Sequence, residues 1–228
     1  MAGLFVTSTG TGIGKTFVTA GLIRYLRAEG RNVAAFKPVI SGFDPAQVDN
    51  SDTGILLSAL GLSANEAQIE RISPWRFAAP LSPDMAAARE NRSVDFNALV
   101  NFSKSALSAA NDATLIEGVG GIMVPLDRTH TVLDWMKELD LPLLLVVGSY
   151  LGSISHTLSA VAVLRQQGLK LAMIVVSESE GSTVSLDETA GTISRFARDV
   201  GIVALPRKMN AADAGGAFGF IADSCGLL

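Results

Sequence analysis

Cysteine is almost absent from the sequence, since Cys225 is the only one among 228 residues. No disulfide can therefore form within the chain, which favours a reducing, cytoplasmic location. Charge is also scarce, because 18% of the residues are charged and the formal net charge is -4. A mildly acidic chain has no general attraction to nucleic acids or anionic membranes, so neither is expected as a partner.

Long hydrophobic runs are missing as well. Residues 141–147 form one of the longest apolar blocks, far short of the ~18 residues that cross a bilayer. The first residues lack a basic segment followed by an apolar core, so no signal peptide is expected. Hydrophobic residues nevertheless make up 48% of the chain and no linker-like stretch divides it. We therefore expect one compact domain over residues 1–228.

Short runs of Val, Ile and Leu alternate with longer amphipathic stretches along the chain. The expected strands are 4–6, 33–36, 114–116, 143–147, 171–176 and 202–205. The expected helices are 15–28, 52–60, 96–110, 132–139, 154–167 and 185–200. Strands that are apolar at nearly every position are typical of a parallel sheet covered on both faces. The alternation predicts a doubly wound α/β fold, mostly parallel, with ligands at the carboxyl ends of the strands.

Residues 64–92 fit this pattern poorly, because Pro74, Pro80 and Pro83 interrupt them. We expect a long loop there, with one short helix near residues 84–89. Loops of this length in compact domains are often functional, and a plain surface loop is the alternative.

A glycine-rich segment lies between the first expected strand and the first expected helix. It consists of Ser8-Thr9-Gly10-Thr11-Gly12-Ile13-Gly14-Lys15-Thr16. The N–H groups of such a loop can surround a phosphate, while Lys15 reaches the β- and γ-phosphates and Thr16 holds Mg²⁺. The alternative is an ordinary glycine-rich turn. The standard motif has glycine where Thr9 stands, so the pattern predicts a variant phosphate loop. The spacing of Gly10, Gly12 and Gly14 does not fit the glycine motif of dinucleotide-binding folds.

Three charged side chains stand where expected strands end or helices begin. Lys37 ends the second strand and is followed by Pro38; it either neutralises a transferring phosphoryl group or is an ordinary surface lysine. Asp52 begins a helix, which it can simply cap. Glu117 closes the third strand before a glycine-rich turn and is either an inner or outer ligand of Mg²⁺ or a solvated strand end.

Other candidate chemistry is weaker. The loop from Gly148 to His156 leads into a helix whose free N–H groups can hold an anion, or it merely connects two elements. His130 and His156 have no Cys or His partner at ligand spacing, so no zinc site is expected. Cys225 is interpreted as a bystander.

The order and spacing of these motifs resemble the dethiobiotin synthetases over nearly the whole chain. The matching segments are Thr7-Ser8-Thr9-Gly10-Thr11-Gly12-Ile13-Gly14-Lys15-Thr16, Lys37-Pro38-Val39-Ile40-Ser41-Gly42, Asn50-Ser51-Asp52, Pro80-Leu81-Ser82-Pro83, Glu117-Gly118-Val119-Gly120-Gly121 and Val147 through His156. The resemblance implies a P-loop NTPase-like fold and an ATP-dependent cyclo-ligase of biotin synthesis. In that family, one amine of 7,8-diaminopelargonate takes up CO₂ as a carbamate, the carbamate attacks the γ-phosphate of ATP, and the second amine closes a cyclic urea with loss of phosphate. It also implies a homodimer with the substrate site at the interface.

Carried over by position, the resemblance implies that Lys15 and Lys37 are catalytic and that Thr16, Asp52 and Glu117 arrange Mg²⁺. The implied nucleotide-binding residues are Gly12, Ile13, Gly14, Lys15, Thr16, Phe17, Asp52, Glu117, Gly118, Val119, Gly120, Ser177, Pro206 and Arg207. The implied substrate-binding residues are Thr11, Lys37, Ser41 and, for the substrate carboxylate, Gly152, Ser153, Ile154 and Ser155. Phosphoryl transfer depends on positioning and charge neutralisation more than on a strong base, which agrees with this set.

Three positions depart from the pattern of that family. Ser8 replaces a glycine that is usual at the start of the loop, and Gly12 replaces a frequent acidic residue. Ser177 stands where an asparagine that binds the base is expected. An asparagine amide matches a donor and an acceptor on adenine, whereas serine offers one hydroxyl, so we expect looser nucleotide selectivity.

Two other functions are compatible with a phosphate loop. An ATP-driven, MinD-like switch of the chromosome-partitioning type, which binds a protein partner, uses an extra lysine near the start of the loop, where this chain has Gly10. An amide-forming synthetase usually carries an added glutaminase domain with a nucleophilic cysteine, which Cys225 does not supply. The sequence therefore favours the cyclo-ligase.

Overall fold

The computed structural model describes residues 2–228 and is built around a six-stranded sheet with the strand order β2-β5-β1-β6-β7-β8. The strands are β1 (Ala2–Ser8), β2 (Val33–Phe36), β5 (Ala113–Glu117), β6 (Leu143–Gly148), β7 (Leu171–Ser177) and β8 (Gly201–Leu205). Neighbouring strands pair in parallel throughout. The predicted parallel sheet is therefore confirmed, and β1 lies at its centre.

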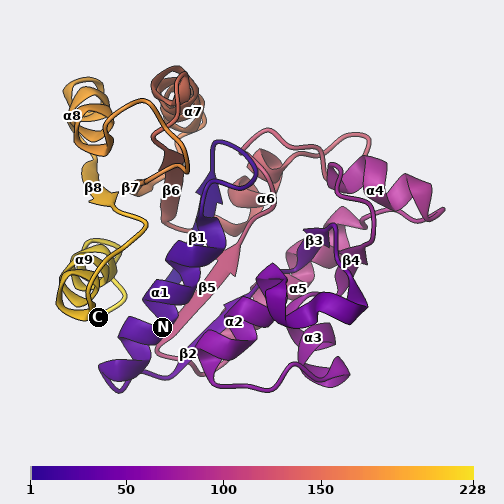
Figure 1. The fold of residues 1–228 in the computed structure, drawn as a ribbon. Coiled ribbons are helices and arrows are strands. Elements are labelled where there is room, and N and C mark those ends of the chain that lie inside the picture. Colours follow the sequence, from indigo (N-terminus) through magenta and orange to yellow (C-terminus); the bar gives the residue numbers. More distant parts are fainter. Residues whose placement is uncertain (1) are drawn as a thin grey trace.

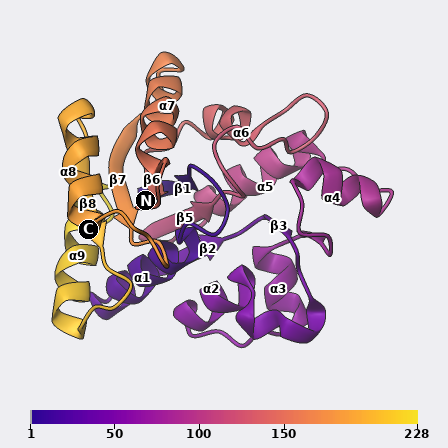
Figure 2. The same cartoon turned by 45° about the horizontal axis from the view of Figure 1, so that its top comes forward.

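Helices cover both faces of this sheet (Figures 1 and 2). They are α1 (Lys15–Ala28), α2 (Asp52–Leu60), α3 (Glu66–Ile72), α4 (Pro83–Arg89), α5 (Phe96–Ser108), α6 (Val132–Leu139), α7 (Ser153–Gln166), α8 (Leu186–Phe196) and α9 (Ala211–Ser224), and a 3-10 helix spans Pro45–Asn50. Alternate residues of β1 point to opposite faces: Leu4 and Val6 belong to one buried apolar cluster and Phe5 to the other. The two clusters explain why the strands are apolar at almost every position.

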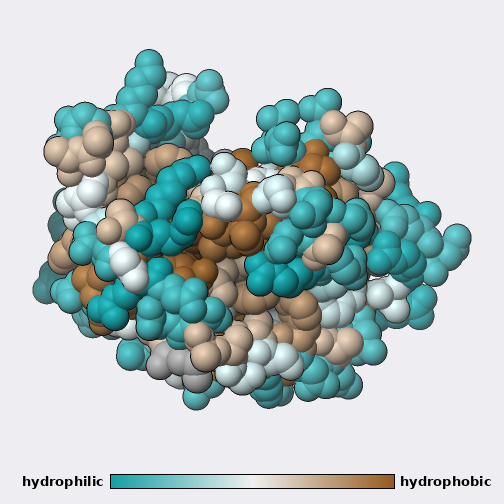
Figure 3. Space-filling model, turned by 90° about the horizontal axis from the view of Figure 1, so that it is seen from below, coloured by the Kyte–Doolittle hydropathy of each residue, from teal (hydrophilic) through white to brown (hydrophobic). Residues whose placement is uncertain are grey.

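Apolar side chains are concentrated inside the fold. Hydrophilic residues cover most of the face drawn in Figure 3, and brown apolar residues show mainly in its centre. Within residues 2–228, no helix has the length and the apolar character that a membrane crossing requires.

A second, smaller sheet lies apart from the main one and was missed by the sequence analysis. It pairs β3 (Val39–Ser41) in parallel with β4 (Trp75–Phe77), on the side of the molecule opposite β8 (Figure 1). The expectation of a long loop over residues 64–92 was therefore wrong, because α3, β4 and α4 occupy most of it. Its short helix near residues 84–89 is confirmed as α4.

The predicted helices are found within a few residues of their expected ends, and α9 was missed. Helix α5 ends at Ser108 rather than at residue 110, and α8 spans Leu186–Phe196 rather than 185–200. Ser51 caps α2, since its Oγ accepts a hydrogen bond from the N–H of Gly54 at 3.1 Å. Asp52 is thus the first residue of the helix, and the alternative in which it serves only as the cap is excluded.

Candidate active site

The phosphate loop connects β1 to α1, as the motif predicts. Gly14 immediately precedes α1 with φ 101°, and Gly12 has φ 71°, backbone conformations that residues with a Cβ rarely adopt. A Cβ on Gly14 would also lie 2.7 Å from the Oγ of Ser177 at the end of β7. Glycine at position 14 therefore lets the loop turn sharply and expose N–H groups at the start of α1.

Lys15, the first residue of α1, turns back over this loop. Its Nζ donates to the Oγ of Ser8 at 2.9 Å and to the carbonyl oxygens of Gly10 and Gly120, both at 3.0 Å. Burial, together with the positive charge of Lys37, lowers the pKa of Lys15 to about 8. The ammonium is therefore held at the loop by three oxygen acceptors in a site that disfavours its charge.

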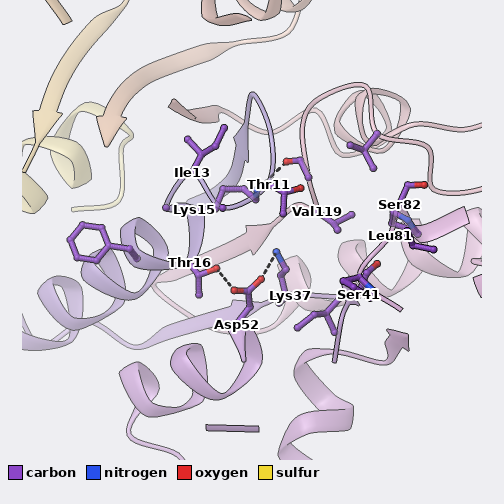
Figure 4. A pocket seen from close by; sticks show the side chains of 18 residues that line it. Thr11, Ile13, Lys15, Thr16, Lys37, Ser41, Asp52, Leu81, Ser82 and Val119 are labelled. Atoms are coloured by element: carbon purple, nitrogen blue, oxygen red, sulfur yellow. Dashed lines mark hydrogen bonds and ion pairs between the residues drawn. The ribbon is translucent and has the colours of Figure 1, made fainter. Parts of the chain in front are cut away.

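A second cluster lies beside the loop, where β5 ends and α2 begins. The Nζ of Lys37 donates to Glu117 Oε1 at 2.8 Å and to the carbonyl of Gly118 at 2.7 Å. It also lies 3.3 Å from Asp52 Oδ2. Figure 4 shows Thr16, Asp52 and Lys37 pointing toward one another at the edge of a cavity. The hydroxyl of Thr16 lies 2.8 Å from both Asp52 Oδ1 and Glu117 Oε1.

Burial excludes the simpler interpretations of Lys37 as a surface lysine and of Glu117 as a solvated strand end. Lys37 is 2% exposed and Glu117 is 0% exposed. The backbone N–H of Lys37 donates to the carbonyl of Ile72, the last residue of α3, which fixes the start of its side chain. Burial alone lowers the pKa of Lys37, but the carboxylates of Glu117 and Asp52 outweigh it and hold that pKa above 10.5. For Asp52, burial is outweighed by Lys37 and Thr16, so the pKa of the carboxyl lies below its ordinary value.

The oxygen atoms of Thr16, Asp52 and Glu117 fit a divalent cation. Glu117 Oε2 is buried and has no hydrogen-bond partner, which leaves one carboxylate oxygen available. Among the described residues there is no cluster of three or more His, Cys, Asp or Glu side chains that could hold a metal by itself. Two carboxylates and a hydroxyl suit Mg²⁺, which usually takes its remaining ligands from water and phosphate.

A cavity of about 730 Å³ opens from these groups. Its walls include the expected substrate-binding residues Thr11 and Ser41, and the Oγ of Ser41 is buried without a partner. Residues 80–83, which follow β4, line the cavity beside Ser41 (Figure 4). The remaining lining residues are Gly12, Ile13, Gly14, Lys15, Thr16, Phe17, Lys37, Ile40, Asp52, Val119, Gly120 and Val124. The cavity therefore runs from the phosphate loop to the small sheet.

A second hollow of about 540 Å³ lies on the other side of the phosphate loop. Ser177 and Arg207 line it together with Phe17, as the sequence predicts for a base site, whereas Pro206 is not among its lining residues. Glu178 accepts a hydrogen bond from the N–H of Arg207 at 2.9 Å. The hollow is thus closed by the segments that follow β7 and β8.

The turn predicted to hold a carboxylate lies elsewhere. Gly152 precedes α7 with φ 98°, and the Oγ of Ser153, which is 1% exposed, has no partner. None of residues 152–155 lines the two cavities described above. Leu151, next to this turn, is 83% exposed. Within one chain, the turn is therefore not part of the wall around Lys15 and Lys37.

Comparison with known proteins identifies the family of this chain. A family model described as an AAA domain matches residues 2–207, which is most of the chain. "ATP-dependent dethiobiotin synthetase BioD" of Acidiphilium cryptum is 48% identical over 86% of this chain and 88% of its own length. The protein of the same description from Phenylobacterium zucineum is 46% identical over 93% and 92%. The chain belongs to the dethiobiotin synthetase family.

Solved structures extend the comparison to the fold. The MinC:MinD cell division protein complex of Aquifex aeolicus matches with a TM-score of 0.57 at 15% identity, covering 96% of this chain and 86% of that one. The cell division ATPase MinD of Pyrococcus furiosus matches with a TM-score of 0.53 at 16% identity, covering 98% of both chains. At such low identity the likeness shows the P-loop NTPase-like fold alone. Membership of the dethiobiotin synthetase family therefore separates this chain from the switch proteins.

Several lining residues of this dethiobiotin synthetase family member were not among the predicted site residues. They are Ile40, residues 80–83 and Val124 in the first cavity, and Tyr150, Glu178, Ser179 and Glu180 in the second. A signal was present for residues 80–83, which lie in the proline-interrupted segment. Glu178 and Glu180 could have been found from their position just after β7, because ligands bind beyond the carboxyl ends of strands in parallel sheets.

Proposed function

We propose that this protein converts 7,8-diaminopelargonate, CO₂ and ATP into dethiobiotin, ADP and phosphate, as a step of biotin biosynthesis. The observation that carries the proposal is the convergence of two buried lysines and two carboxylates beside the phosphate loop. Family membership supplies the substrate class. The described P-loop domain is proposed to perform the whole reaction.

The phosphate end of the site is proposed to bind the triphosphate of ATP. The N–H groups at the start of α1 and the ammonium of Lys15 lie together at the phosphate loop. Both are donors that an anion can accept from. Thr16, Asp52 and Glu117 would hold Mg²⁺, which neutralises phosphate charge when bound. Lys37 contacts Glu117 and Asp52 beside the loop, and the two ammonium groups can stabilise charge on the transferring phosphoryl group and on the carbamate that attacks it.

The other end of the cavity is proposed to bind the diamine. Thr11 and Ser41 lie in its wall, and a hydroxyl can donate to a carbamate or accept from an amine. Apolar side chains, among them Ile40, Leu81 and Val124, line the same space. Such a wall suits the aliphatic chain of a diamino acid.

The carboxylate end of the substrate is proposed to reach a second copy of the chain. The hydroxyl of Ser153, at the N-terminus of α7, is buried and has no partner, so it can donate to an anion. Because residues 152–155 do not line the cavity of their own chain, a homodimer would let them complete the cavity of a partner. Sedimentation equilibrium tests this, since a monomer at assay concentrations would contradict the shared site.

The proposal also covers the residues that contact the nucleotide base and the location of the protein in the cell. Ser177 and Arg207 are proposed to contact the base, and Ser177 is the reason to expect weak discrimination among bases. A cytoplasmic location agrees with a single cysteine.

The direct test is product formation from purified protein. Mixing it with 7,8-diaminopelargonate, labelled bicarbonate and Mg-ATP should release ADP and incorporate label into dethiobiotin in equal amounts. Lys15→Ala and Lys37→Ala should each lower kcat by about a hundredfold or more, because each removes a cation from the transferring phosphate. ADP release that does not depend on the diamine would refute the proposal.

A further inference from the structure

Ser8 is the last residue of β1 and its side chain is 0% exposed. Its Oγ accepts a hydrogen bond from Lys15 Nζ at 2.9 Å and one from the N–H of Gly10 at 3.3 Å. The same oxygen lies 2.6 Å from the carbonyl of Gly10 and 2.9 Å from the carbonyl of Gly120. One hydroxyl therefore touches the catalytic lysine and both carbonyls that this lysine contacts.

These contacts join two loops. Gly10 belongs to the phosphate loop, whereas Gly120 belongs to the turn that follows Glu117. The backbones also meet, because Thr9 and Gly121 form an isolated antiparallel bridge, and a Cβ on Gly121 would lie 3.1 Å from the carbonyl group of Thr9. The cluster of Ser8, Lys15 and the two carbonyls thus closes the gap between the loop that takes phosphate and the turn beside the carboxylates.

Nucleotide binding changes the hydrogen bonds that this cluster can make. When Lys15 turns its ammonium toward a phosphate, it gives up bonds to the carbonyls of Gly10 and Gly120. A carbonyl left without a donor in a part-buried site disfavours that movement. The hydroxyl of Ser8 is within hydrogen-bond distance of both oxygens, so its one proton keeps one of them paired after the lysine leaves.

We propose that Ser8 is a positioning residue for Lys15, and that the one hydroxyl proton of Ser8 keeps one of the two loop carbonyls paired when the ammonium turns toward the phosphate. The role follows from a hydroxyl that both accepts and donates, which neither glycine nor alanine provides. Ser8 does not touch the phosphate itself. Ser8 acts through Lys15. The proposal rests on the proposed function only for the choice of nucleotide and assay.

Removal of the hydroxyl tests this directly. In Ser8→Ala, we expect the KM for ATP to rise about tenfold, the effect of leaving one carbonyl unpaired in the bound state. The KM for 7,8-diaminopelargonate should stay within about twofold, because Ser8 does not line the substrate cavity. A merely structural defect would not raise one KM and spare the other.

Thr7→Val is the matched control. Thr7 precedes Ser8 in the same strand, is 1% exposed, and its hydroxyl has no partner, so removing that hydroxyl breaks no hydrogen bond. Both KM values should remain those of the wild type. Ser8→Cys, which keeps a weak donor, should fall between the wild type and Ser8→Ala and provides the measurement if Ser8→Ala fails to fold.

Titration with a fluorescent ATP analogue separates this proposal from the proposed function. The affinity of Ser8→Ala should fall about tenfold in that titration, whether or not dethiobiotin is formed. If the wild type made no dethiobiotin, the proposed function would fail while the role of Ser8 could still be measured. Equal analogue affinity in Ser8→Ala and the wild type would overturn the role of Ser8.

Discussion

Replacing Lys37 by Met tests the electrostatics of the site most severely, because it removes an ammonium and keeps the alkyl chain. Lys37 lies 2.8 Å from Glu117, and both side chains are almost completely buried. Removing one partner of a buried ion pair costs about 3 to 5 kcal/mol, since the other charge is left without compensation. With an m-value of about 2 kcal/mol/M, the urea midpoint should fall by roughly 1.5 to 2.5 M.

The double variant Lys37→Met/Glu117→Gln separates stability from activity. Without the carboxylate charge, much of the lost stability should return, whereas ADP release should stay at least about a hundredfold below the wild type because the cation is missing. Lys104→Met is the matched control, since Lys104 pairs with Glu138 at 3.4 Å on the surface, and it should change stability by less than about 1 kcal/mol. A stable Lys37→Met single variant would refute the view that this ammonium balances Glu117.

Three further predictions concern Lys15, Ser177 and Cys225. The pKa of Lys15 is about 8 in the folded protein, against 10.5 in the unfolded chain. Between pH 8 and pH 10.5, Lys15 is therefore protonated mainly in the unfolded state. The free energy of unfolding should rise with pH in this range, by at most about 1.4 kcal/mol per pH unit. Urea unfolding across that window checks this, and Lys15→Met should flatten the curve. Ser177→Asn should increase the ratio of kcat/KM for ATP over GTP and CTP; a strong ATP preference in the wild type would contradict the looser selectivity expected from serine. Burial raises the pKa of Cys225 to about 12, so iodoacetamide should label it only after denaturation, and rapid labelling of the native protein would show that the thiol is accessible.

The charged residues of the site could be predicted because parallel strands bring their ends to one edge. Lys37 directly follows β2 and Glu117 ends β5, two strands that are recognisable from their apolar residues alone, and β2 pairs directly with β5. That pairing places their side chains in contact although they are 80 positions apart in the chain. The choice between cap and site for Asp52 could not be made from sequence, because Ser51 and Asp52 are both good caps.

The missed elements depend on packing that leaves little trace in the sequence. Helix α9 contains Gly215, Gly216 and Gly219, residues of low helix propensity. It forms against α1, where Phe218 packs so closely on Gly21 that a Cβ there would lie 2.0 Å from the ring. Strands β3 and β4 are three residues each, too short for a periodic pattern, and they pair across more than thirty intervening positions.

The small sheet also separates two tasks that could be engineered independently. Ser41 ends β3 and residues 80–83 follow β4, and the N–H of Gly42 donates to the carbonyl of Ala79 at 3.1 Å. This wall of the cavity is thus held by its own short framework, while the groups proposed to face phosphate lie on α1, on α2 and at the ends of β2 and β5. Changes in the size of Ile40 or Leu81 should therefore adapt the enzyme to diamino acids of other chain lengths and leave the phosphate chemistry intact.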